Sequence, residues 1–146
     1  MYSKEQIISA NIRIMCYNHN KKRAVVIFMK KIINISLYKN KRLELEENNI
    51  AALFNEEKYT FIIKDVKTSI SSKYFTRETE EYLFTLDIEN KKCSYLLKEK
   101  NMTFDIEVEK AIYERRRRNI NLVYKIASDE EEFEVKIEEL EGELNE

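Results

Sequence analysis

Apolar and polar residues alternate with a period of two along residues 119–137 of the chain. The first half of this stretch has an apolar residue at every second position, at Ile120, Leu122, Tyr124 and Ile126. A polar break at residues 128–131 follows, after which the alternation resumes with Phe133, Val135 and Ile137. Alternation on both sides of a short polar turn is typical of an antiparallel hairpin with one buried face.

The same pattern recurs over most of the chain. It predicts further strands at residues 6–16, 23–29, 32–38, 43–45, 59–63, 66–72, 82–88, 93–97 and 102–108. The last of these could continue to Tyr113. Residues 46–58 do not alternate, and the alanines at their centre indicate either a short helix or a covering loop around residues 50–54. Residues 74–80 are predicted to form a loop.

These strands predict an all-β fold, because almost the whole chain is extended. Closing a long antiparallel sheet removes its exposed edges. We therefore expect an up-and-down, lipocalin-like β-barrel of about 8–10 strands, with a two-sheet sandwich as the alternative. Residues 1–138 would form this single domain, and the acidic residues 139–146 would form a frayed tail.

The composition narrows the choice of function. The chain has 146 residues and a net charge of -1, which weighs against a dedicated nucleic-acid binder. It contains one glycine and no proline, so the turns must use Asn, Asp, Ser, Lys and Glu. With a single glycine in the sequence, a glycine-rich phosphate-binding loop is also excluded.

Targeting signals and catalytic motifs are not evident in the sequence. The first residues lack the apolar run of a secretory signal, and no run approaches the roughly 20 apolar residues of a membrane span. We therefore expect a cytoplasmic protein without a membrane association. Cys16 and Cys93 lie in strand-like runs without metal-site spacing, so we expect two buried thiols, no metal and no cofactor. A non-enzymatic role is favoured.

Aromatic residues on the predicted inner faces are the first candidate site. They are Phe84, Tyr95, Phe104 and Tyr124. In a narrow barrel these side chains would be core. In a wider barrel they would line a cavity for a small apolar or amphipathic ligand.

Four consecutive arginines form the second candidate site: Arg115, Arg116, Arg117 and Arg118. They could contact phosphates, RNA or an acidic partner, with Tyr113 nearby for stacking. Successive residues of a strand point to opposite faces, so the four would not form one stripe. The alternative without a binding function is a solvated turn whose charge is balanced by residues 129–132 or by the tail. An interaction module of this kind could also be a homodimer.

The C-terminal half has a recognisable order of strands. A tyrosine-containing strand at residues 93–97 is followed by alternating strands at residues 102–108, 120–126 and 133–137. Over residues 81–138 this order resembles the YwiB-like family of small bacterial proteins. The resemblance implies a lipocalin-like (calycin) β-barrel and carries over no active-site residues.

Overall fold

The computed structural model describes residues 12–19, 22–128 and 130–140, with side chains from residue 28 onward. Its regular elements are eleven β-strands: β1 (Ile12–His19), β2 (Lys22–Lys39), β3 (Arg42–Asn55), β4 (Lys58–Ile63), β5 (Val66–Ile70), β6 (Tyr74–Glu78), β7 (Tyr82–Asp87), β8 (Lys92–Leu97), β9 (Met102–Arg116), β10 (Asn119–Ile126) and β11 (Glu131–Glu139). Within these residues the chain forms no helix.

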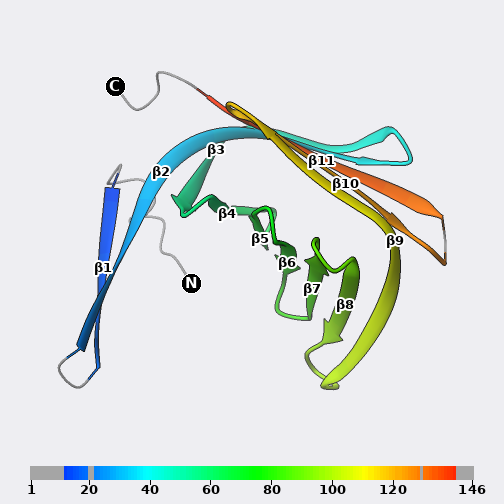
Figure 1. The fold of residues 1–146 in the computed structure, drawn as a ribbon, viewed down its shortest axis with the longest axis horizontal. Helices are drawn as coiled ribbons and strands as arrows, with labels where there is room; N and C mark the ends of the chain where they lie inside the picture. Colours follow the sequence, from blue (N-terminus) through cyan, green and yellow to red (C-terminus); the bar gives the residue numbers. More distant parts are fainter. Residues whose placement is uncertain (1–11, 20–21, 129, 141–146) are drawn as a thin grey trace.

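Strands β2 to β11 form a closed antiparallel barrel. Each strand from β2 to β10 pairs with the next one in sequence, and β11 pairs back with β2. The predicted all-β, up-and-down, lipocalin-like barrel is therefore confirmed. Strand β1 pairs only with the first part of β2, and Figure 1 shows this two-stranded arm extending from the barrel.

Several barrel turns have a left-handed backbone without using glycine. Three two-residue loops have both φ angles between 48° and 68°, as in the type I′ turns that match the twist of a hairpin. They are Asn40–Lys41, Glu56–Glu57 and Lys64–Asp65. Turns of Asn, Lys, Glu and Asp are what the composition predicted, and each non-glycine residue in this region costs some conformational energy.

The helix or covering loop expected at residues 50–54 is wrong, because these residues belong to β3. The register of β3 against β2 shifts at Asn34, so that Ile33 pairs with Ile50 and Ile35 pairs with Glu47. Asn49 has a φ of 59° at this bulge, and its N–H donates to Asn34 Oδ1 at 2.9 Å. The one extra residue on β3 changes the phase of the alternation, which hides the strand in the sequence.

Two other expected boundaries also change. Residues 74–78 form strand β6 where a loop was predicted, because Phe75 is fully buried and pairs with Leu86. Strand β11 includes Glu139, which was assigned to the tail, and the N–H of Leu140 donates to the Ile32 carbonyl. Residues 141–146 and the start of the first predicted strand lie outside the described residues.

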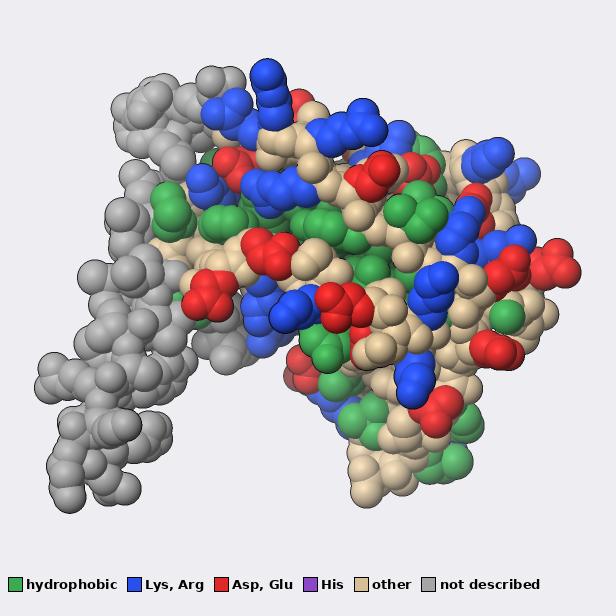
Figure 2. Space-filling model, in the orientation of Figure 1, with side chains coloured by type: hydrophobic (Ala, Val, Ile, Leu, Met, Phe, Trp, Pro, Cys, Tyr) green, Lys and Arg blue, Asp and Glu red, His purple; other side chains and the backbone are tan. Residues whose placement is uncertain are grey.

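The inner face of the barrel is filled by apolar side chains. Its most buried large residues come from β2, β4, β5, β6, β7, β10 and β11: Ile33, Ile35, Tyr59, Phe61, Ile70, Phe75, Leu86, Leu122 and Ile137. The outer face has many charged residues, and Figure 2 shows both signs interspersed over one view of the surface. The barrel therefore has a packed middle, and sites for ligands must lie toward its ends.

Candidate functional site at the barrel mouth

Three of the four predicted aromatic residues form one row across neighbouring strands. Phe84 on β7 pairs with Tyr95 on β8, and Tyr95 pairs with Phe104 on β9. Directly paired residues of antiparallel strands point to the same face. This row lies beside the row that contains the buried Leu86 and Cys93 and the partly buried Ile106, so it continues the inner face of the barrel.

The fourth residue, Tyr124 on β10, meets the row from another strand. Its ring centroid lies 6.1 Å from that of Phe84 and 6.0 Å from that of Phe75. It also stacks on Phe133 of β11 at 5.0 Å. The structure thus brings Tyr124 and Phe84 together in an aromatic cluster that also contains Phe75 and Phe133.

Exposure increases along the row from the cluster outward. Tyr124 is 7% exposed and Phe84 is partly buried against the core, whereas Phe104 is 45% exposed. The next row outward consists of Tyr82, Leu97 and Met102, and Met102 is also 45% exposed. Tyr82 stacks on Tyr95 at 5.1 Å. We define the barrel mouth as the inner-face residues Tyr82, Phe84, Tyr95, Leu97, Met102 and Phe104.

Sequence reasoning missed Arg77, which lies on the same row. Arg77 on β6 pairs with Phe84, and its Nε is buried with no hydrogen-bond partner among the described residues. The signal was present, since Arg77 follows the buried Phe75 by two positions and so shares its face. It was overlooked because residues 74–80 were interpreted as a loop.

A small cavity lies beside Arg77. It has a volume of about 100 Å³ and is lined by inner-face residues that include Arg77, Phe75, Tyr124 and Phe133. Drug-sized ligands occupy pockets of roughly 300–1,000 Å³. The enclosed space is therefore large enough for only part of a ligand.

Two acidic residues, Glu44 and Glu134, also border this cavity. Glu134 alternates with the inward-facing Phe133 and Val135, and it pairs with Tyr38. The ammonium of Lys136 lies 5.3 Å from the Tyr38 ring, which places Tyr38 on the outer face. Alternation thus directs the Glu134 carboxylate outward, and Glu44 occupies a bulge of β3 next to the inward-facing Leu45. Neither carboxylate is within ion-pair distance of the Arg77 guanidinium in the described structure.

Electrostatics at this cavity favour neutral tyrosine. Burial raises the pKa of the Tyr124 hydroxyl well above its ordinary value, and the positive charge of Arg77 opposes that increase only in part. Burial also raises the pKa of the Cys93 thiol to about 11. Neither group is therefore an activated nucleophile at neutral pH.

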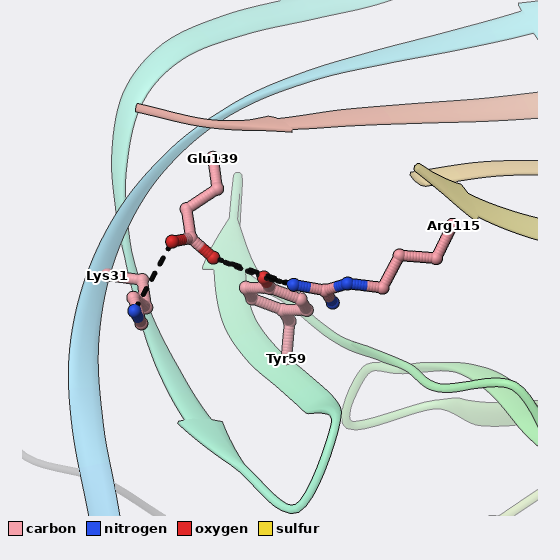
Figure 3. A network of polar contacts seen from close by, with 4 residues as sticks. All are labelled: Lys31, Tyr59, Arg115 and Glu139. Atoms are coloured by element: carbon pink, nitrogen blue, oxygen red, sulfur yellow. Dashed lines mark hydrogen bonds and ion pairs between the residues drawn. The ribbon is translucent and has the colours of Figure 1, made fainter. Parts of the chain in front are cut away.

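A polar network closes the opposite end of the barrel (Figure 3). Glu139 Oε1 accepts a 2.5 Å hydrogen bond from the Tyr59 hydroxyl, and Oε2 accepts one from Lys31 Nζ at 3.2 Å. Arg115 Nη2 donates to the Tyr59 oxygen at 3.1 Å. We call these four residues the closing network. They come from β2, β4, β9 and β11, including the pair β2–β11 that closes the barrel.

The carboxylate of the closing network is charged at neutral pH. Partial burial alone would raise the pKa of Glu139. Hydrogen bonds from Tyr59 and Lys31, together with the nearby positive charges, outweigh that effect, so the pKa lies below its ordinary value. A carboxylate that already accepts two hydrogen bonds is a weak general base. The geometry therefore indicates a structural role for this network.

The four arginines are divided among different surroundings. Arg115 is in the closing network, and its guanidinium carbon lies 5.5 Å from the Tyr59 ring centroid. Arg116 borders a polar groove on the outer face, and Arg117 occupies the following turn with a φ of 56°. Arg118 lies beside Glu139 at the end of β11, with its carbonyl accepting the N–H of that residue.

Two hollows larger than the cavity beside Arg77 open on the outside of the barrel. One is a groove of about 510 Å³ with mainly amide and charged lining, including Asn34, Asn119 and Asn121. The other, of about 780 Å³, is bordered by charged residues such as Lys64 and Glu78, by the outward-facing Ile62, and by Tyr82 of the barrel mouth. Both are open to solvent. The first lacks the apolar lining that small-molecule sites usually have, whereas the second includes apolar surface at Ile62 and Tyr82.

Comparison with known proteins adds no assignment: no family model, no curated protein and no solved structure matches this chain. The resemblance to the YwiB-like family therefore stays a prediction. In the part of the chain that the structure describes, no helix has the length and apolar character needed to cross a bilayer. The same residues contain no cluster of three or more His, Cys, Asp and Glu side chains suited to a metal ion.

Proposed function

We propose that this barrel binds a small amphipathic molecule at the barrel mouth. The observation that supports the proposal is the continuous aromatic row from the partly buried Phe84 to the half-exposed Phe104. A side chain such as Phe104 gains free energy when apolar surface covers it. An apolar ligand lying along the row would provide that cover, and the cavity beside Arg77 would enclose one end of it.

A neutral fluorescent probe, N-phenyl-1-naphthylamine, tests this proposal. Its emission increases in apolar surroundings, so titration into the purified protein should give a saturable increase. Phe104→Ser removes half-buried aromatic surface from the mouth, and we expect about fivefold weaker binding, which corresponds to about 1 kcal/mol. Tyr95→Ser should weaken binding further, because it also removes the ring stacked on Tyr82.

Ile112→Ser is the matched control. Ile112 lies on the same strand as Phe104 and is 49% exposed, but it is on the outer face. Its substitution should leave probe binding unchanged. The proposal is refuted if the wild-type protein gives no saturable increase, or if Ile112→Ser weakens binding as much as Phe104→Ser.

The interaction-module hypothesis for Arg115, Arg116, Arg117 and Arg118 is the weaker proposal. Arg115 faces Tyr59 and Glu139, so it contributes little to a shared outer surface. A phosphate-binding patch would therefore rest on the remaining three residues. Arg116 borders the outer groove, whereas Arg117 and Arg118 border a separate hollow that also contains acidic residues. Neutralising them should leave the affinity for RNA unchanged if the barrel mouth is the binding site.

A further inference from the structure

Arg77 is the one inner-face cation of the barrel mouth end whose buried donor has no partner among the described residues. It lies between the buried Thr68 of β5 and the aromatic Phe84 of β7, with which it pairs. A buried polar group without a partner is costly, and the cost is larger for a charged group. Such a group in a native protein therefore needs an explanation, and binding of a ligand that accepts from it is one.

The position of the unpaired donor indicates the chemistry of that ligand. The Nε of a guanidinium forms, with one Nη, a planar fork of two parallel donors. A carboxylate matches this fork with two hydrogen bonds, and such pairs are among the strongest in proteins. A neutral alcohol has a single oxygen, so it cannot accept both parallel hydrogen bonds in the way a carboxylate does.

The cavity has the size for such a head group. Its volume of about 100 Å³ is bordered by Arg77, Phe75, Tyr124 and Phe133. The three rings would cover one side of the head group, and reduced contact with water there strengthens a charged hydrogen bond. The apolar remainder of the molecule would extend along the row from Phe84 toward Phe104.

From these observations we infer that the ligand is an amphipathic carboxylate, anchored by Arg77 and covered by the aromatic row of the barrel mouth. This inference rests on the proposed function and adds the charge of the ligand and the residue that selects it. Arg77 is thus a specificity-determining residue, and the apolar row supplies the remaining affinity.

Competition against N-phenyl-1-naphthylamine with dodecanoate and with dodecan-1-ol tests the inference. The two competitors share the alkyl chain and differ in the head group. We expect the wild-type protein to bind dodecanoate at least tenfold more tightly than dodecan-1-ol, as a charged, bidentate pair requires. Arg77→Met should lower the affinity for dodecanoate about tenfold and leave the affinity for dodecan-1-ol within about twofold of the wild-type value.

Two further variants sharpen the result. Arg77→Lys keeps the charge but lacks the planar fork, so its preference for dodecanoate should fall between those of the wild type and Arg77→Met. Arg116→Met removes an arginine that borders the outer groove, and it should change neither affinity. Arg77→Met should also fold at least as stably as the wild type without ligand, because it removes a buried unpaired donor. This readout separates loss of binding from loss of structure.

The outcomes distinguish this inference from the function on which it rests. If the probe does not bind the wild-type protein, the proposed function fails and the inference fails with it. If the probe binds but both competitors displace it equally, or Arg77→Met weakens both equally, only the inference is overturned. A selective loss of dodecanoate binding in Arg77→Met supports both.

Discussion

Glu139→Gln is the substitution that should most directly reveal what the closing network contributes to stability. Gln keeps the shape of the side chain and can still accept from the Tyr59 hydroxyl. It loses the ion pair with Lys31, whose side chain is only 17% exposed. Lys31 and Arg115 are then left without the carboxylate that lies 3.2 Å and 3.9 Å from them.

The size of the effect follows from the burial of these groups. A hydrogen bond to a charged group contributes about 1.5–3 kcal/mol, and breaking a fully buried ion pair costs about 3–5 kcal/mol. The network is partly open to solvent, because the Arg115 side chain is 33% exposed. We therefore expect Glu139→Gln to lower the free energy of unfolding by about 2 kcal/mol, or the Tm by about 4–8 °C for a domain of this size.

Equilibrium unfolding in urea, followed by far-ultraviolet circular dichroism, measures this change. Glu138→Gln is the matched control, since its carboxylate is exposed on the outer face and lies 3.5 Å from Asn34 Nδ2. We expect that control to stay within about 0.5 kcal/mol of the wild type. Lys31→Met combined with Glu139→Gln should cost less than the sum of the single changes, because both removed groups interact.

The same network should make stability depend on pH in the acidic range. The pKa of Glu139 is lower in the folded protein than its ordinary value, so the folded state favours the charged form. This contribution is complete above the ordinary glutamate pKa of about 4.3, and it is lost as the pH falls through the lower, folded value. Glu139→Gln should flatten this acid loss. Equal stability of Glu139→Gln and the wild type at pH 7, or an unchanged acid dependence, would refute the reasoning.

Two further predictions follow from the turns and from the buried thiol. Lys41→Gly should raise the free energy of unfolding by about 0.5–1 kcal/mol, because Lys41 has a φ of 68° in a type I′ turn that favours Asn-Gly. Urea unfolding measures the change. Lys91→Gly, at a residue with a φ of 55° in another turn, checks whether such a gain in stability is general. In a Cys16→Ser background, Cys93 should not react with a thiol reagent at pH 8 until the protein is unfolded, because burial raises its pKa to about 11. Rapid labelling of the native protein would contradict that prediction.

The barrel could be predicted from the sequence because the apolar residues of its inner face occupy every second position of the strands. Leu122, Tyr124, Val135 and Ile137 are all buried, as the alternation of residues 119–137 requires. Each strand also pairs with its neighbour in sequence, so local turns were enough to order the sheet. An up-and-down topology is the case in which local pattern and global fold agree most closely.

The errors lie where a local irregularity breaks that pattern. In β3 the bulge at Asn49 moves the inner face from Leu45 and Glu47 to Ile50 and Ala52. A window across the bulge shows no consistent period, and the alanines then favour a helix by only a few tenths of a kcal/mol. Pairing with β2 outweighs so small a preference.

Contacts between distant residues could not be predicted from the pattern. Lys31 and Glu139 are 108 residues apart, and they meet only because β11 pairs with β2 to close the barrel. The exposure of Phe104 is a similar case. The alternation of Phe104 with Asp105 predicts which face of the strand Phe104 lies on. Its 45% exposure arises because β9 extends beyond the packed middle of the barrel, which the alternation does not reveal.

The two ends of the barrel differ in how their inward-facing charges are satisfied. At one end, Lys31 and Arg115 share the carboxylate of Glu139, with the Tyr59 hydroxyl between them. The charged groups at that end are bound to one another, so a ligand would have to break these bonds to enter. The buried Tyr113 hydroxyl near Arg115 has no hydrogen-bond partner among the described residues, but it carries no charge. At the mouth, the buried Nε of Arg77 lacks such a partner, and a cavity lies beside it. A ligand there would supply a missing interaction, which is why the barrel mouth is the end to test for binding.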